Sequence, residues 1–114
     1  MSSPGLQGLR PWMIQRISAA FIALYVIYLF SVLLLASPLH ADKWAQWVAQ
    51  PWNTTGMALF MLAILWHAWI GVRDIILDYV PNVVARLLVL TVLAGIIIGS
   101  GLWGLKALLM VAIK

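Results

Sequence analysis

Cysteine is absent from this sequence, and charged residues are scarce. Without cysteine, disulfides, thiolate metal sites and cysteine-based catalysis are excluded. Only 9% of the 114 residues are charged, whereas a soluble domain carries roughly 25%. With 65% hydrophobic residues and a mean hydropathy of +1.05, the chain has too few polar groups to cover its own surface. We therefore expect a single small domain, residues 1–114, that uses the lipid bilayer as its solvent.

Acidic residues are rarer than basic ones. Seven Lys and Arg residues stand against three Asp, which gives a formal net charge of +4. The cations are scattered along the chain rather than gathered in a patch, as expected of residues that flank membrane spans. The basic balance therefore does not indicate nucleic-acid binding, and we expect no nucleic-acid partner.

Three long apolar runs are present, and each predicts a membrane-spanning helix. Each run is near the length, about 17–25 residues, that a helix needs to cross a hydrocarbon core about 30 Å thick. Because lipid offers no hydrogen-bond partners, the backbone of each run must satisfy itself, and a helix does so within one segment. The predicted fold is an all-α membrane protein with three transmembrane helices, at about 15–36, 55–79 and 83–107.

The connections between the spans are short. In the first, Trp44, Trp47 and Val48 fall on one helical face, which predicts a short helix lying in the membrane interface. In the second, Pro81 and Asn82 separate the second span from the third. The first span is too long for the apolar core of a signal peptide, and no small-residue cleavage site follows it. We therefore expect this span to be retained.

The cations divide unevenly between the two sides of the membrane. Three spans place the termini on opposite sides, with four arginines on the N-terminal side and three lysines on the other. These are Arg10, Arg16, Arg73 and Arg86 against Lys43, Lys106 and Lys114. The positive-inside rule then predicts that the N-terminus lies in the cytoplasm and the C-terminus in the periplasm.

One histidine, His67, lies within the second span. It is about 12 residues from either end of a span drawn from 55 to 79, which is close to the bilayer midplane. An imidazole at this depth is costly unless it is hydrogen-bonded or coordinated, so it marks a candidate functional site. Two interpretations stay open: a neutral histidine bonded to a backbone carbonyl or to a serine of a neighbouring helix, and an axial ligand of haem iron. Gly71, one turn further on the same face, leaves room for a porphyrin, but glycine also serves helix packing.

A haem bound at His67 would need its second axial ligand from another chain. The other histidine, His40, lies in the first connection, roughly 20 Å from His67 along the membrane normal. Met57 and Met61 share a helix with His67 and cannot reach the opposite face of the ring. A six-coordinate haem site would therefore lie at an interface between subunits.

Polar residues gather at the end of the second span. Asp78 lies 11 residues after His67, so it projects from nearly the same helical face, about 16 Å away in height. Tyr79 follows at the membrane boundary, where phenols are common in the aromatic belt. The carboxylate can orient the phenol, pair with Arg73 or Arg86, or pass protons to a buried site.

The segment HAWIGVRDIILDYV, residues 67–80, resembles the second-helix signature of the succinate dehydrogenase hydrophobic membrane anchor subunit, the D chain of bacterial complex II. The likeness extends over the chain in its three helices and its short basic N-terminus. It includes RISAAFIALYVIY, which opens the first span, and the spacing from His67 to Asp78 and Tyr79. The third span and the first connection match only in character.

The resemblance implies a role for each of these residues. His67 would be one axial ligand of haem b, and the second ligand would come from the companion anchor subunit, the C chain. Arg16 would lie near the haem propionates, although its position at the start of the first span also suits a simple anchoring cation. Asp78 and Tyr79 would border the ubiquinone site, with the tyrosine hydroxyl donating a hydrogen bond to a quinone carbonyl.

The resemblance also implies the activity and the partners. The chain would anchor a flavoprotein subunit and an iron–sulfur subunit to the bacterial inner membrane. Succinate would be oxidised at the flavin, outside this chain, and electrons would pass to ubiquinone at the membrane surface. We expect this chain to hold no succinate-oxidising site of its own. It would form one wall of the quinone pocket, with most of that pocket supplied by the iron–sulfur subunit and the C chain.

Three other interpretations of the sequence stay open. A fumarate reductase anchor would have the same architecture and run the reverse reaction, although several such anchors lack haem and so leave His67 without a role. A homodimer would hold haem between the His67 side chains of two copies, with no enzymatic partner. The third is a structural three-helix membrane protein with no cofactor.

Overall fold

A computed structural model of the chain describes residues 4–36 and 40–113. These residues form four α-helices and, within those two ranges, no strand. The helices are α1 (Pro4–Leu35), α2 (Ala41–Ala49), α3 (Pro51–Tyr79) and α4 (Val83–Ile113). The predicted all-α fold, with one short helix between the first two long ones, is confirmed.

Three of the helices are long and apolar enough to cross a membrane. The candidate spans are Leu9–Leu35, Pro51–Tyr79 and Val83–Ile113, of 27, 29 and 31 residues. At a rise of 1.5 Å per residue each helix is roughly 40–46 Å long, more than a hydrocarbon core of about 30 Å requires. Each helix therefore extends beyond the hydrocarbon core, and the chain is a multi-pass membrane protein.

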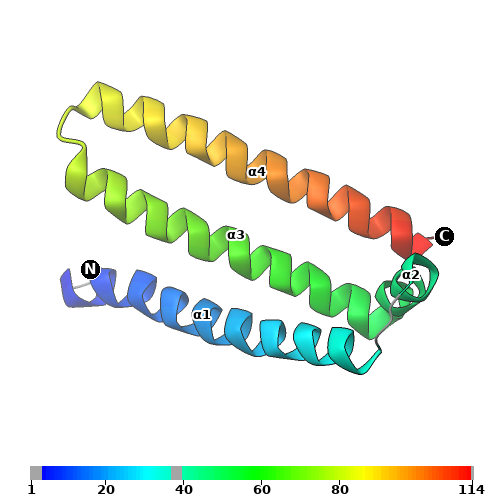
Figure 1. Ribbon diagram of the computed structural model, residues 1–114. Helices are drawn as coiled ribbons and strands as arrows, with labels where there is room; N and C mark the ends of the chain where they lie inside the picture. Colours follow the sequence, from blue (N-terminus) through cyan, green and yellow to red (C-terminus); the bar gives the residue numbers. More distant parts are fainter. Residues whose placement is uncertain (1–3, 37–39, 114) are drawn as a thin grey trace.

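The three long helices lie in a row, with α3 between α1 and α4 (Figure 1). Helix α3 packs against both neighbours, whereas α1 and α4 make no packing contact with each other within the part of the chain that the structure describes. The short α2 covers one end of the row and contacts α3 and α4. The two termini lie at opposite ends of the molecule, as three spans require (Figure 1). Lys114, counted above among the cations of the C-terminal side, lies outside the described residues.

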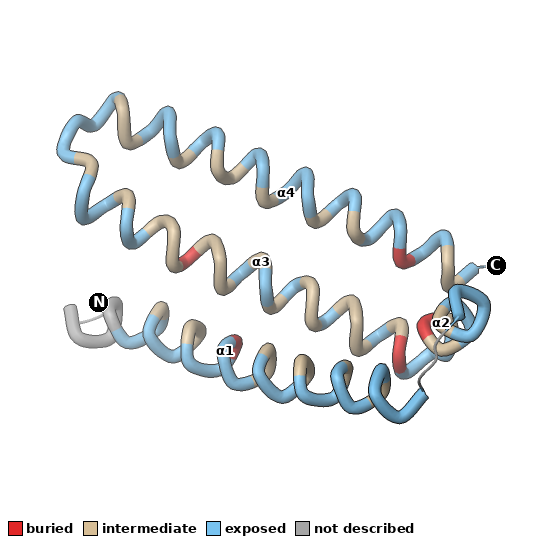
Figure 2. Tube along the Cα trace, viewed as in Figure 1, coloured by how far each residue is buried: buried red, intermediate tan, exposed pale blue. Residues whose placement is uncertain are grey.

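A row of three helices buries few side chains. Among the described residues the buried apolar side chains are Val48, Ile70 and Leu108, and the buried polar ones are Ser18 and Asn53. Large apolar side chains are exposed on all three long helices, and exposed positions run along each of these helices (Figure 2). Such a surface is stable only against lipid or other apolar chains.

At the end of the row near α2, a buried asparagine links the neighbouring helices. The Asn53 amide nitrogen donates to the carbonyl of Trp47 (2.9 Å) and to the side-chain oxygen of Gln50 (3.0 Å), while the Tyr28 hydroxyl donates to its Oδ1 (3.0 Å). These bonds tie α1, the α2–α3 connection and α3 together. Trp44 stacks on Trp47 with ring centroids 5.2 Å apart. The tryptophan face expected of the short helix therefore packs as one unit.

The opposite end of the row is closed by a tight corner between α3 and α4. Pro81 has no N–H to donate and forces Val80 into an extended conformation (φ −107°, ψ 100°), which ends α3. The side-chain oxygen of Asn82 then accepts hydrogen bonds from the backbone N–H groups of Val84 (2.9 Å) and Ala85 (3.1 Å). This is an N-terminal helix cap, so the same few residues end one span and begin the next.

Candidate functional site

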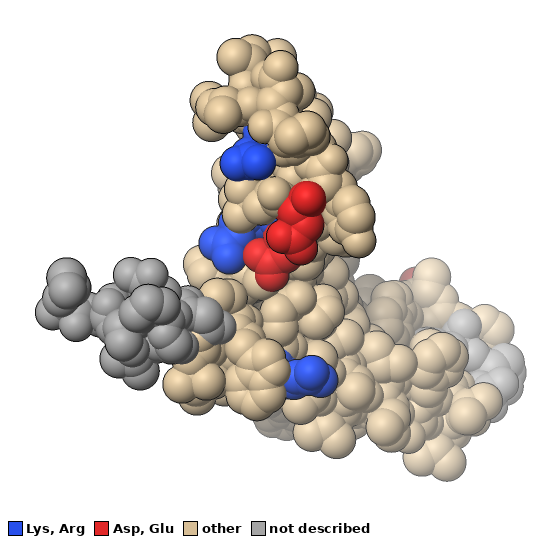
Figure 3. Space-filling model, turned by 90° about the vertical axis from the view of Figure 1, so that its left-hand side faces the viewer, with Lys and Arg blue, Asp and Glu red and all other residues tan. Residues whose placement is uncertain are grey.

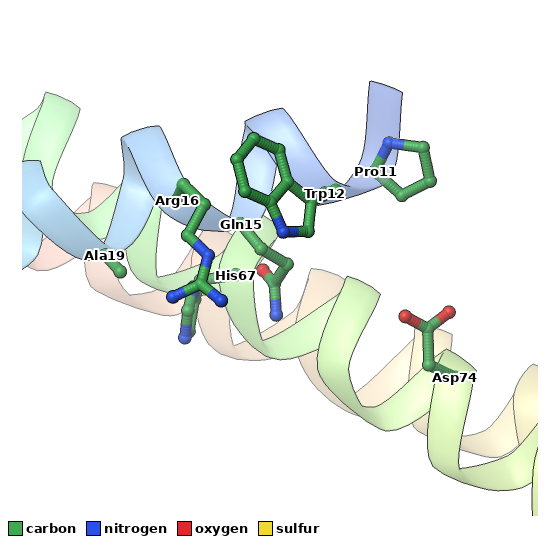
Figure 4. Close-up of a pocket in the computed structure, with 7 residues that line it drawn as sticks. All are labelled: Pro11, Trp12, Gln15, Arg16, Ala19, His67 and Asp74. Carbon is green, nitrogen blue, oxygen red and sulfur yellow. The ribbon is translucent and has the colours of Figure 1, made fainter. Parts of the chain in front are cut away.

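A groove of about 590 Å³ lies between α1 and α3, toward the end of the row where the chain begins. Helix α1 contributes most of its lining, and α3 contributes His67 and Asp74 (Figure 4). The residues from α1 are Pro11, Trp12, Gln15, Arg16 and Ala19. The groove therefore brings together His67 and Arg16, two of the four site residues predicted from the sequence.

His67 is held by a serine of the neighbouring helix. Its Nδ1 lies 3.0 Å from the hydroxyl oxygen of Ser18, which is itself buried. The Ser18 hydroxyl also lies 3.1 Å from the backbone carbonyl of Gln15, to which it donates. A hydroxyl carries a single proton, so with that proton directed at the carbonyl Ser18 accepts a hydrogen bond from Nδ1–H of His67. In that neutral tautomer, Nε2 carries the free lone pair.

This bond bears on both interpretations of His67 that the sequence left open. It is the bond to a serine of a neighbouring helix expected of a purely structural histidine. It occupies only one ring nitrogen, however, and a hydrogen bond from the second nitrogen is also the usual arrangement for a histidine that binds a metal. The geometry thus prepares Nε2 as a ligand without requiring one.

Arg16, on α1, lies closer to the level of His67 than the charged groups of α3 do. It precedes Ser18 by two residues, about 3 Å of helical rise from the His67–Ser18 bond. Arg73 and Asp74 follow His67 by six and seven residues, about 9–10 Å of rise, and pair with each other at 3.2 Å. Arg16 is thus a permanent positive charge about one turn deeper than that ion pair.

The side chains around Arg16 leave a polar atom without a partner. The Arg16 guanidinium lies over the ring of Trp12, 5.5 Å from its centroid, which is a cation–π contact. The side-chain oxygen of Gln15 is buried and accepts no hydrogen bond from any described residue. A Cβ added at Gly71 would meet only the Gln15 amide nitrogen, at an ordinary contact distance of 3.5 Å. Packing within this chain therefore does not require glycine at this position.

Asp78 and Tyr79, the other two predicted site residues, lie outside the groove. Both are exposed on the last turn of α3, and Tyr79 is 79% exposed. The expected partners of Asp78 are engaged elsewhere. Arg73 pairs with Asp74, and Arg86 donates to the backbone carbonyl of Val80 at 3.1 Å. The structure thus places Asp78 and Tyr79 on the last turn of α3, outside the groove and not beside His67.

The last turn of α3, with Asp78 and Tyr79, and the groove belong to the same charged end of the molecule. Figure 3 views this end and shows acidic side chains next to arginine side chains. The groups come from the first turns of α1, the last turns of α3 and the start of α4. His40, in contrast, precedes α2 at the opposite end of the row, so the expectation that it cannot reach His67 agrees with the fold. The described residues contain no cluster of three His, Cys, Asp or Glu side chains that would hold a metal ion.

Two polar residues that line the groove, Asp74 and Gln15, were not predicted from the sequence, and neither was Ser18, the serine that bonds His67. Asp74 lies seven positions after His67, which is two turns along the same face, so helical periodicity alone indicates it. Gln15 and Ser18 are among the few polar residues of the first span, and that contrast was the available signal. The pairing of Ser18 with His67 depends on the register between α1 and α3, which no local pattern encodes.

The fold and the groove together define a class: a multi-pass helical membrane subunit that presents one histidine and one arginine to an open groove. Comparison with known proteins gives the family. The model of the succinate dehydrogenase/fumarate reductase transmembrane subunit family matches residues 7–103. The succinate dehydrogenase hydrophobic membrane anchor subunit of Coxiella burnetii (strain RSA 493 / Nine Mile phase I) is 30% identical over 102 residues, 90% of this chain and 89% of that relative. The chain belongs to this family of membrane anchor subunits, and the resemblance found in the sequence is confirmed.

Proposed function

We propose that this chain is the membrane anchor of a succinate:ubiquinone oxidoreductase, that it binds haem b together with a companion anchor subunit, and that it forms one wall of the ubiquinone site. One observation carries the haem part of the proposal. His67 is oriented by Ser18 in a groove that also receives Arg16. Membership of a family of succinate dehydrogenase and fumarate reductase anchors supports the rest.

The residues of the groove fit a haem. A neutral imidazole with Nδ1 bonded to Ser18 offers Nε2 to iron. Arg16 offers a cation to a propionate, and a Cβ added at Gly71 would meet only the amide nitrogen of Gln15, at 3.5 Å. When bound, the haem would take up and return single electrons. The second axial ligand would come from the companion subunit, because His40 lies at the other end of the fold.

Tyr79 and Asp78 would serve the quinone. A quinone carbonyl gains negative charge as it is reduced, and a preplaced hydroxyl donor stabilises that charge. Tyr79 is exposed at the end of its helix, so its hydroxyl can reach a ligand held mainly by other subunits. Asp78, adjacent to it on the same turn, would orient the phenol or pass it a proton.

The proposed partners follow from this division of work. A flavoprotein subunit would oxidise succinate, and an iron–sulfur subunit would carry the electrons to the charged end of this chain. This chain would contribute no succinate-oxidising residue. The complex would lie in a bacterial inner membrane, with the N-terminus of this chain in the cytoplasm.

The replacement His67→Leu tests the proposal. Leucine suits the apolar span, so the helix should insert while the haem is lost or loosened. The measurement is the reduced-minus-oxidised visible spectrum and the iron content of the purified complex. His40→Leu is the matched control, because it removes the other histidine from the opposite end of the fold, and it should keep the wild-type spectrum. An unchanged low-spin b-type spectrum in His67→Leu, at full iron stoichiometry, would refute the ligand assignment.

A further inference from the structure

Arg86 is bonded to the backbone of the turn that carries Asp78 and Tyr79. Its Nε donates to the carbonyl of Val80 at 3.1 Å, and a terminal nitrogen of its guanidinium lies 3.5 Å from the carbonyl of Leu77. These two carbonyls flank the Asp–Tyr pair in the sequence. The guanidinium therefore spans the segment on which the pair sits.

This contact supplies hydrogen-bond donors and positive charge to the C-terminal end of α3. The last carbonyls of a helix have no N–H partner within the helix, and they carry its negative dipole end. Arginine supplies both a positive charge and several donors in a fixed planar fork. The contact joins two helices although its partners are close in sequence, because Arg86 belongs to the first turns of α4 and its side chain bonds the end of α3.

The corner is fixed from its other side as well. The N–H of Val80 donates to the carbonyl of Ile76 at 3.0 Å, which completes the last turn of α3. Asn82 caps the first N–H groups of α4, and the N–H of Arg86 donates to the carbonyl of Asn82 at 2.9 Å. The backbone of Arg86 is thus fixed in the first turns of α4, and its side chain bonds the last turn of α3.

Tyr79 depends on this backbone for its direction. Its side chain is 79% exposed, so packing within the chain does little to hold it. A hydroxyl that must meet a quinone carbonyl has to be placed to within a fraction of an ångström, and a misplacement of about 1 Å can cost roughly a hundredfold in rate. Whatever fixes the last turn of α3 therefore fixes the donor.

We infer that Arg86 is a positioning residue for quinone reduction, acting through the backbone of the last turn of α3 on Tyr79. The inference rests on the proposed role of Tyr79 at the quinone. Arg86 itself needs no contact with the quinone, because the donors that the structure shows in use are directed at the carbonyls of Val80 and Leu77.

A double-mutant cycle in the whole complex tests this. Quinone reduction is measured in Arg86→Leu, Tyr79→Phe and the double variant, each normalised to succinate oxidation with a soluble acceptor that takes electrons from the flavin. Arg86→Leu should lower the normalised turnover by roughly tenfold to a hundredfold. The double variant should be no slower than Tyr79→Phe alone, because without the hydroxyl there is no donor left to misplace.

Two further variants separate positioning from assembly. Arg86→Lys keeps the charge but loses the planar fork, so it should recover part of the turnover and retain a normal haem spectrum. It also provides the measurement if Arg86→Leu fails to assemble. Arg10→Leu removes another exposed cation from the same end of the molecule and should leave the normalised turnover unchanged.

Each remaining outcome contradicts the inference in a recognisable way. Wild-type normalised turnover in both Arg86 variants, with Tyr79→Phe impaired, would overturn it and leave the proposed function standing. Multiplying losses in the double variant would show that Arg86 acts elsewhere than through Tyr79. A normal turnover in Tyr79→Phe would remove the quinone wall itself, and the inference would fall with it.

Discussion

A single hydrogen bond decides which nitrogen of His67 is free. Ser18 occupies Nδ1, and with its own proton on the Gln15 carbonyl it leaves Nε2 as the nitrogen with the free lone pair. The depth of the histidine and the glycine one turn away were predicted from the sequence. The sequence left open a bond to a serine of a neighbouring helix but did not indicate which serine, because α1 and α3 are separated by a connection whose length does not define their register. Local spacing predicts which residues share a helix face, whereas contacts between helices come only from the packed structure.

The charged residues at the end of α3 illustrate the same limit. The sequence offered Arg73 and Arg86 as partners for Asp78. In the structure Arg73 pairs with its neighbour Asp74, and Arg86 donates to backbone carbonyls. Backbone acceptors are not visible in a pattern of side chains, so the contacts of Arg86 could not be predicted.

Tyr79→Phe tests a single side-chain group, because it removes one hydrogen-bond donor and keeps the ring. A donor to a charge that develops on reduction contributes about 2–4 kcal/mol in favourable sites. Quinone reduction should therefore fall by roughly thirtyfold to nearly a thousandfold. Succinate oxidation with a soluble acceptor should stay near normal, because the flavin of the proposed complex would lie in another subunit.

Asp78→Asn separates two roles of the carboxylate in the same pair of assays. If Asp78 only orients the phenol, the amide should lower quinone reduction less than Tyr79→Phe does. If it relays protons, the loss should be comparable. Unchanged quinone reduction in Tyr79→Phe would make the tyrosine a member of the interfacial aromatic belt and place the quinone wall elsewhere.

The helices themselves were predicted well, since each is specified by a local signal. Long apolar runs define the three spans, and the tryptophan face of residues 44–48 defines α2. Their arrangement was less accessible. Spans that are apolar on all sides do not show which face meets another helix. The sequence therefore did not reveal that α3 lies between α1 and α4, which leaves the groove beside His67 open at the surface.

The whole molecule is a layer that needs other chains or lipid to cover it. Few side chains are buried, and the groove with His67 and Arg16 opens outward and not into a core. A subunit built in this way can offer half of a site. The outward-opening groove and the Gln15 oxygen, which has no partner among the described residues, are consistent with the proposed companion subunit completing the site.

The orientation of the whole chain in the membrane can also be predicted. The termini lie at opposite ends of the row, and the four arginines lie toward the N-terminal end, where α1 begins and α3 ends. By the positive-inside rule, reporter fusions should place the N-terminus in the cytoplasm and the C-terminus in the periplasm. A C-terminal fusion that reports a cytoplasmic location would mean that the orientation is reversed or that a helix does not span.

The central claim is that this chain supplies one axial ligand to a haem shared with a companion anchor. Its most direct test is the visible and electron paramagnetic resonance spectrum of the purified chain, expressed with and without that companion. We expect a low-spin, six-coordinate b-type haem at full stoichiometry only when both anchors are present. The same six-coordinate spectrum from this chain expressed alone, or a full haem content in which His67→Leu makes no difference, would contradict it.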